Sequence, residues 1–290
     1  MNKVDRLLRT YQEIDIPEDL EFTIRKIISK KEKRMKKNRS IRIAATTAAA
    51  VIIVFAGTVN ASPAAANAMS DIPVLKELVQ LVTLREMIYG DENHEADVKV
   101  PKVTGLENTQ LESALNEKYL EESTKLYHDF LKEVGEAELT PAKLGLFTDY
   151  SVKTNTDDLY VIERIKTEIA ASGSESVHYD NIDLKNQLII TLPGLFQDDS
   201  YIDVISNNII KQMQDKMAAD ENLTYFIDVK DGMGGFAKIS QDQPFYINSE
   251  HKLVIVFNEY DVAPGYMGIV EFIIPTEVIQ DILVSDTYIK

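Results

Sequence analysis

The sequence predicts an α+β protein that crosses the membrane once, with short cytoplasmic helices and a folded extracellular domain. Two observations carry this prediction. The first is an uncharged stretch of 17 residues from Ile43 to Val59, which follows a basic segment. The second is the order of elements beyond it, in which strands alternate with helical segments. That order is typical of a largely antiparallel sheet with helices on one face, so we expect two or three helices to pack on it.

Two amphipathic helices are expected before the uncharged stretch. Their apolar faces are Val4, Leu7, Leu8 and Tyr11 in the first helix and Leu20, Ile24, Ile27 and Ile28 in the second. Pro17 suits the first position of the second helix. Helices this short are marginal in water on their own. They therefore need a cytoplasmic partner or, alternatively, the membrane surface, to which the adjacent basic run would attract them.

The uncharged stretch is expected to be a transmembrane helix over residues 40–61. Eight lysines and arginines lie between Lys30 and Arg42, and none lies between Ile43 and Leu75. The positive-inside rule then places residues 1–39 in the cytoplasm and the C-terminal domain outside the cell. A cleaved secretory signal is the alternative, but signals are usually about 15–30 residues long, and this apolar core begins later. The basic run is explained by its role in setting the orientation of the chain in the membrane. Because no folded nucleic-acid-binding domain accompanies it, we expect no nucleic acid partner.

A juxtamembrane segment with a protease-sensitive site is expected over residues 62–93. The small residues that suit cleavage in this region are Ala61, Ala64, Ala66 and Ala68. From Asp71 to Tyr89 apolar residues recur at helical spacing, which predicts a helix leading away from the membrane.

The extracellular sensor domain is expected over residues 94–290. A strand is predicted at residues 98–103 and a long helix at residues 108–133. Further strands are predicted at residues 144–152, 159–169, 177–183, 187–192, 252–260 and 268–274. A second helix is expected from Ile202 to Met217 and a last one from Thr276 to Val284, with a break at Gly232 to Gly235.

The charge of the chain differs strongly between its two sides. Thirteen lysines and arginines and seven acidic residues up to Arg42 give +6, and since the whole chain carries −16, the remainder carries −22. The negative electrostatic field of this part favours a basic extracellular partner. The alternative explanation is that the acidic residues serve only to keep the domain soluble. The absence of cysteine excludes disulfides, thiol catalysis and a lipid anchor on cysteine.

Two loops are the candidates for binding. Pro264, Gly265, Tyr266 and Met267 place a tyrosine at a tip between apolar strands, and tyrosine is enriched at binding hot spots. The alternative is that Tyr266 folds back onto the sheet. Ser172 and Ser174 belong to a polar tip that we expect to be flexible, and this tip could equally be a plain linker.

No catalytic pattern is present in the sequence. The four histidines His94, His128, His178 and His251 do not fall at metal-ligand spacings, and no nucleophile elbow or His-Glu-x-x-His sequence occurs. We therefore expect no enzymatic activity, no metal site and no cofactor.

Several runs of the chain resemble a known family over nearly its whole length. The sequence from Phe257 to Gly268 and from Glu271 to Pro275 is similar to the extracellular signature of lysozyme-sensing membrane anti-sigma factors of the sigma-V type. The runs from Val59 to Ala64 and from Ala68 to Val74 resemble the juxtamembrane stretch of membrane-bound anti-sigma factors.

The resemblance implies a mechanism with four partners. The cytoplasmic helices would hold an extracytoplasmic-function sigma factor inactive, and the outer domain would bind lysozyme, which is basic. Signal peptidase would then cut just outside the membrane, and an intramembrane site-2-type metalloprotease would cut the span. The alternative is a membrane-anchored cell-wall-binding or lysozyme-inhibiting module that has no sigma factor as client.

Overall fold

The computed structural model describes residues 79–137, 143–227 and 235–290. The predicted cytoplasmic helices, the predicted transmembrane helix and most of the juxtamembrane segment lie outside these ranges, as do Gly232 to Gly234 of the expected break. Within these ranges no helix has the length and apolar character that crossing a bilayer requires.

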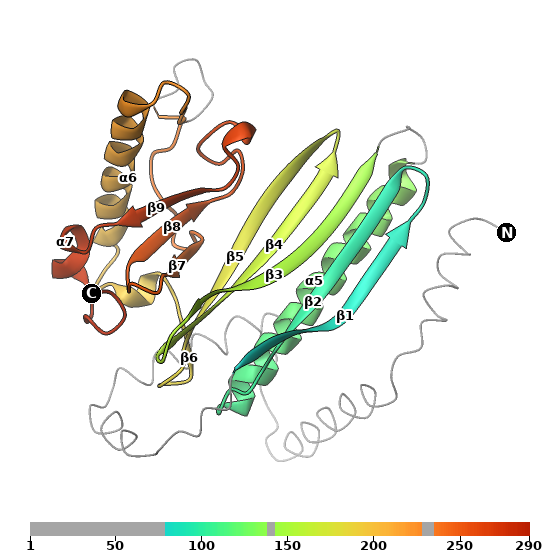
Figure 1. Cartoon of the computed structure of the whole chain (residues 1–290), viewed down its shortest axis with the longest axis horizontal. Coiled ribbons are helices and arrows are strands. Elements are labelled where there is room, and N and C mark those ends of the chain that lie inside the picture. The colour runs from blue at the N-terminus through green and yellow to red at the C-terminus, as the bar shows by residue number, and fades with distance from the viewer. Residues whose placement is uncertain (1–78, 138–142, 228–234) are drawn as a thin grey trace, which may run out of the picture. The chain divides into compact units, whose positions relative to one another are not determined.

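The first of two β-sheets has six strands in sequence order (Figure 1). They are β1 (Gln80–Gly90), β2 (His94–Thr104), β3 (Leu144–Asn155), β4 (Leu159–Ala170), β5 (Ser172–Asp183) and β6 (Leu188–Ile190). Neighbouring strands are antiparallel except β2 and β3, which are parallel. The reason is that a helix connects these two strands, and such a crossover returns the chain in the same direction. The sheet is therefore mixed, which corrects the expected antiparallel arrangement at this one pair.

Strand β1 replaces the second half of a predicted helix. The helix expected from Asp71 to Tyr89 is wrong from Gln80 onward, where the chain pairs with β2. Met87 is buried opposite Val98, whereas the flanking Ile88 is 68% exposed, which is the alternation of a half-buried strand. A short apolar run is compatible with both the helical period of 3.6 residues and the strand period of two. Pairing with β2 makes this segment a strand.

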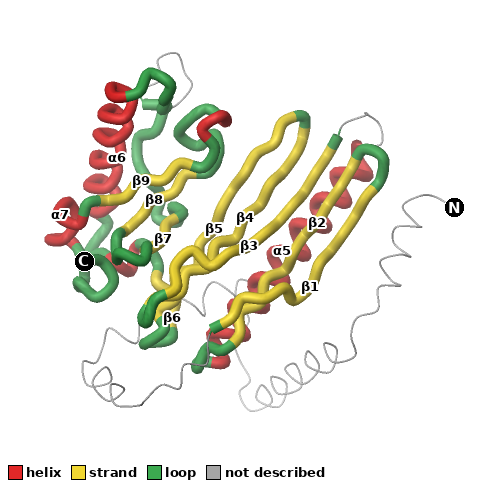
Figure 2. Tube along the Cα trace, viewed as in Figure 1, coloured by secondary structure: helices red, strands yellow, loops and turns green. Residues whose placement is uncertain are grey.

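Helix α5 (Thr109–Ala137) confirms the long helix predicted at residues 108–133. The Asn108 side-chain oxygen accepts hydrogen bonds from the backbone N–H groups of Gln110 and Leu111, both 3.1 Å, and so caps the first turn. The buried face of the helix packs on β2 and β3 through Leu115, Tyr119, Phe130 and Val134. In Figure 2 the helix runs along the first sheet.

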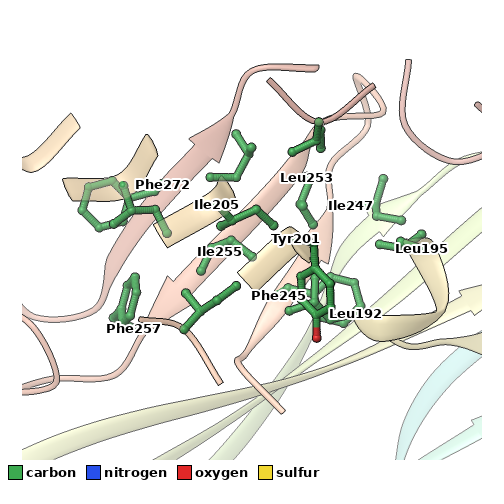
Figure 3. Packing of buried hydrophobic residues seen from close by; sticks show 14 of the residues in the cluster. Leu192, Leu195, Tyr201, Ile205, Phe245, Ile247, Leu253, Ile255, Phe257 and Phe272 are labelled. Atoms are coloured by element: carbon green, nitrogen blue, oxygen red, sulfur yellow. The ribbon is translucent and has the colours of Figure 1, made fainter. Parts of the chain in front are cut away.

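The second sheet consists of β7 (Phe245–Ile247), β8 (Leu253–Phe257) and β9 (Val270–Ile274), all antiparallel. Helix α6 (Ser200–Ala219) confirms the second predicted helix, and the last one is shorter than expected, with α7 at Thr276–Ile279 and a 3-10 turn at Gln280–Ile282. Figure 3 shows Tyr201 and Ile205 of α6 in one core with Phe257 and Phe272 of the sheet. Full burial of one such side chain stabilises a fold by about 1.5–3 kcal/mol.

The two sheets are joined by an apolar cluster and by a buried amide. The cluster comprises Val161, Val177, Tyr246, Val254 and Val256. The Asn181 side chain donates to the Phe245 carbonyl oxygen and accepts from the Ile247 N–H, both at 3.0 Å. Because Asn181 lies on β5, these two hydrogen bonds connect the backbone of β7 to the first sheet.

A buried carboxylate joins α5 to the first sheet. Asp180 accepts hydrogen bonds from Lys118 Nζ at 2.8 Å, from the Tyr119 hydroxyl at 3.0 Å and from Arg164 Nε at 3.2 Å. Burial alone would raise the pKa of Asp180, but the positive charges of Arg164 and Lys118 hold it below its ordinary value. The carboxylate is therefore charged and fully paired inside the fold.

Candidate functional site

The loop between β8 and β9 holds the first group of predicted binding residues. It begins with a turn in which the Asp261 carboxylate accepts from the Asn258 N–H at 2.8 Å, and it continues into a 3-10 turn at Gly265–Met267. The ring of Tyr260 packs directly on Gly265, where a Cβ atom would lie 2.5 Å from the ring. A side chain at position 265 would force the Tyr260 ring to move, so glycine at this position lets the ring pack on the turn.

Tyr266 lies on the surface of this loop. Its side chain is 70% exposed, and its hydroxyl donates to the Asn222 carbonyl oxygen at 2.8 Å. The alternative that Tyr266 folds back onto the sheet is therefore wrong. Tyr260 is 50% exposed and adds a second aromatic ring to the same loop. Two fixed tyrosines offer a large contact area at little entropic cost.

The other predicted residues of the loop position it. Met267 is half-buried against the core of the second sheet, and its sulfur accepts from the Thr224 N–H at 3.5 Å. Pro264 is half-buried and has an extended backbone at the start of the 3-10 turn. These residues hold Tyr266 in place and offer less surface to a ligand than the tyrosine does.

The polar tip at Ser172 to Ser176 is not a flexible loop. It is the beginning of β5, which pairs with β4 from Ala170 opposite Ser172 onward, and Ala171 closes the turn with φ 66°. The Gly and Ser content suggested a linker, but twelve residues of continuous pairing hold the segment as a strand. Ser172 is exposed and Ser174 partly so.

The structure brings this strand and the Tyr266 loop together. The Glu175 N–H donates to the Glu259 carboxylate at 2.9 Å, and the Glu259 N–H donates to the Glu175 carbonyl oxygen at 3.2 Å. The Val177 N–H donates to the Asn258 side chain at 2.8 Å. The two segments predicted to bind are thus parts of one surface.

Sequence reasoning missed Tyr260, Glu175, Asn258 and Glu259. Only Tyr260 left a signal, because it precedes the same Pro-Gly turn as Tyr266. The other three act through hydrogen bonds between segments that are distant in the sequence, and no local pattern predicts such bonds.

The remaining predicted residues lie outside the described ranges. These are Leu7, Leu8, Tyr11, Leu20, Ile24 and Ile27 of the cytoplasmic helices and Ala61, Ala64, Ala66 and Ala68 of the cleavage region. In the part of the chain that the structure describes, no three acidic, histidine or cysteine side chains gather as a metal site would require.

Comparison with known proteins decides the family. The chain is 40% identical over 289 residues to the anti-sigma-V factor RsiV of Bacillus subtilis (strain 168), and the match covers 99% of both chains. The chain belongs to the RsiV family of anti-sigma-V factors. The resemblance noted in the juxtamembrane and C-terminal runs is thereby confirmed, and so is the expectation of a protein that is not an enzyme, because this family regulates transcription.

Two family models also match this anti-sigma-V factor. A domain of unknown function, DUF4179, matches residues 36–104, and a protein family of unknown function, DUF3298, matches residues 194–277. The Tyr266 loop lies in the second match, whereas Ser172 and Ser174 lie in neither. The residues predicted to bind therefore extend beyond the DUF3298 match.

Solved structures resemble the fold. A crystal structure of a DUF3298 family member from Bacteroides fragilis has a TM-score of 0.53 at 20% identity, covering 71% of this chain and 94% of that one. Another from Pseudomonas aeruginosa PAO1 has a TM-score of 0.48 at 14% identity, covering 75% of this chain and all of that one. The first of them supports the α+β fold.

Proposed function

We propose that this chain holds a sigma-V factor inactive through residues 1–39 and releases it when lysozyme binds the extracellular domain. The observation that carries the proposal is the relationship to RsiV over the full length of both chains. The sigma factor is then the cytoplasmic partner that the two short amphipathic helices need in order to bury their apolar faces.

Lysozyme is the proposed extracellular ligand because the surface suits a basic protein. The chain beyond Arg42 carries a net charge of −22, which accelerates the encounter with a cation. Tyr260 and Tyr266 supply exposed aromatic rings on a loop that hydrogen-bonds to β5, the strand on which Ser172 and Ser174 lie. Charge thus accounts for the rate of association and the loop for a compact anchor.

Release is proposed to proceed by two cuts in a single-pass protein of the cell membrane, with its N-terminus in the cytoplasm. Signal peptidase would cut in the region of Ala61 to Ala68, and an intramembrane site-2-type metalloprotease would then cut the span. The span contains Thr46, Thr47 and Gly57, which weaken it as a helix and suit the second cut. We propose residues 79–290 as the sensor, because β1 pairs with β2 and so belongs to the sheet.

The cytoplasmic interaction can be tested without any inducer. Leu7→Asp or Ile24→Asp places an unpaired charge in the apolar interface, which costs roughly several kcal/mol. A sigma-V-dependent reporter should then rise at normal levels of the full-length protein. Thr10→Asp is the matched control, since it adds the same charge off the apolar face, and it should leave the reporter low.

A silent reporter in both interface variants would contradict the role of these helices. It would favour instead a cell-wall-binding or lysozyme-inhibiting module with no sigma factor as client.

A further inference from the structure

A cavity lies between helix α5 and the ends of strands β3, β4 and β5. Its volume is about 430 Å³, and its lining includes Leu126 and Phe130 of the helix and Leu144 and Leu146 of β3. Ser172 and Ser174 of β5 line it as well. The predicted binding serines thus belong to a recess lined by both apolar and polar side chains.

The charged residues that line the cavity are all acidic. They are Asp129, Glu133 and Glu168, and among the residues that the structure describes no lysine, arginine or histidine lines the cavity. Lys125 pairs with Asp129 and Lys166 with Glu168, but both carboxylates are about half exposed or more, and exposed pairs are worth little. Glu133 has no ion pair among the described residues.

The end of α5 strengthens this negative potential. Glu133 lies near the C-terminus of the helix, whose last turn holds no basic residue. A helix C-terminus carries a partial negative charge, so a carboxylate there is unfavourable for the helix itself. A cation placed beside Glu133 would be attracted both by this carboxylate and by the partial negative charge of the helix C-terminus.

The chemistry of the lining selects the occupant. An apolar lining and carboxylates together match a lysine or arginine side chain, whose methylene stem packs on apolar surface while its head stays polar. A bare metal ion does not suit the cavity, because no set of side chains in the described ranges gathers as ligands would.

We propose that this cavity holds a lysine or arginine side chain of the bound basic protein. The inference rests on the proposed function and names a second contact for the same ligand. Strand β5 links the two contacts, since Ser174 lines the cavity and the next residue, Glu175, bonds to Glu259 of the Tyr266 loop. The charge of the cavity is complementary to that partner.

The test compares two carboxylates that line the cavity with one that does not. Binding of hen-type lysozyme to the full-length chain in detergent is measured by surface plasmon resonance for wild type, Glu133→Gln, Glu168→Gln and Glu136→Gln. Glu136 is the matched control because it is exposed on α5 and does not line the cavity. Glu133→Gln and Glu168→Gln should each weaken binding about tenfold, mainly by faster dissociation, because each loses a charged hydrogen bond. Glu136→Gln should change affinity less than about twofold, through association alone.

The outcomes separate this inference from the proposed function. If wild type binds lysozyme and the affinities of Glu133→Gln and Glu168→Gln equal that of Glu136→Gln, the cavity inference is overturned and lysozyme remains the ligand. Absence of wild-type binding would overturn both. Melting followed by circular dichroism should show each variant as stable as wild type, since the exchanged carboxylates are exposed; a loss of affinity that followed a loss of folding would count against the cavity.

Discussion

Tyr266 is the single side chain on which recognition is expected to depend most. Tyr266→Ala should weaken lysozyme binding by about 2 kcal/mol, roughly 30-fold, as truncation of an aromatic hot spot does. Tyr266→Phe keeps the ring and loses only the hydrogen bond to Asn222, so its loss should be about 1 kcal/mol or less. Calorimetry on the solubilised full-length protein measures both, and equal affinity of all three proteins would remove the loop from the interface.

Asp180 is the residue whose ionisation should govern acid stability. Its pKa is lowered in the folded state, so the unfolded chain binds more protons in acid. The contribution of Asp180 to the free energy of unfolding is therefore complete above about pH 4, the ordinary aspartate pKa, and is lost as the pH falls below it. Asp180→Asn leaves Lys118 without its carboxylate partner and Arg164 with Glu122 alone, and it should cost about 3 kcal/mol at pH 7.

Urea unfolding followed by circular dichroism between pH 3 and pH 7 measures this effect. The dependence on pH should be shallower in Asp180→Asn than in wild type. Asp203→Asn is the control, because that carboxylate is exposed and pairs only with the exposed Lys238, and it should change stability by less than about 0.5 kcal/mol. Parallel pH curves for wild type and Asp180→Asn would refute the assignment.

At the scale of elements, Asn181 joins the two sheets. Asn181→Ala leaves the Ile247 N–H and the Phe245 carbonyl without partners in a buried position, which costs about 2 kcal/mol. Hydrogen exchange at the Ile247 amide should accelerate accordingly. Thr154→Val offers a comparison at the same junction, because it removes the hydroxyl that donates to the Ile247 carbonyl oxygen at 2.8 Å, while Thr154→Ser keeps it. Unchanged exchange in Asn181→Ala would show that the Asn181 amide does not hold β7 to the first sheet.

Helices were more predictable from the sequence than strand partners. The two long helices α5 and α6 carry apolar residues three and four positions apart over many turns. A strand, in which apolar residues alternate, does not have this pattern. Strand β1 is not predicted, because its apolar residues fit both helical spacing and strand alternation. Only its hydrogen bonding to β2 shows that it is a strand. The parallel pairing of β2 and β3 follows from the long crossover through α5, and it was not drawn from the sequence.

The candidate site could be predicted only in part. A Pro-Gly-Tyr turn between apolar strands is a local signal, and it located Tyr266 correctly on the surface. The serine-rich segment is harder to predict, because its composition indicates a flexible tip whereas the structure shows the start of β5. The contact between Glu175 and Glu259 joins residues 84 positions apart in sequence, and only the fold brings them together.

At the scale of the whole molecule, the two sides of the chain carry opposite charge. Residues 1–42 are basic and the remainder is strongly acidic, so a basic ligand is attracted to the second part alone. Exposed charges more than about 10 Å apart are screened at 0.1 M salt. Association with lysozyme should therefore slow with added salt, while dissociation, which depends on the contacts of the loop and cavity, should change less.

The measurement that tests the central claim most directly is cleavage of the full-length chain in living cells after addition of catalytically inactive lysozyme. Inactive lysozyme still binds but does not damage the cell wall, so it separates sensing of the protein from sensing of wall stress. We expect immunoblots to show cleavage in the region of Ala61 to Ala68 in wild type, together with a rise of the sigma-V-dependent reporter, and both responses should be weakened in Tyr266→Ala. Cleavage that requires active lysozyme, or that is equal in Tyr266→Ala and wild type, would contradict direct recognition of lysozyme by this surface.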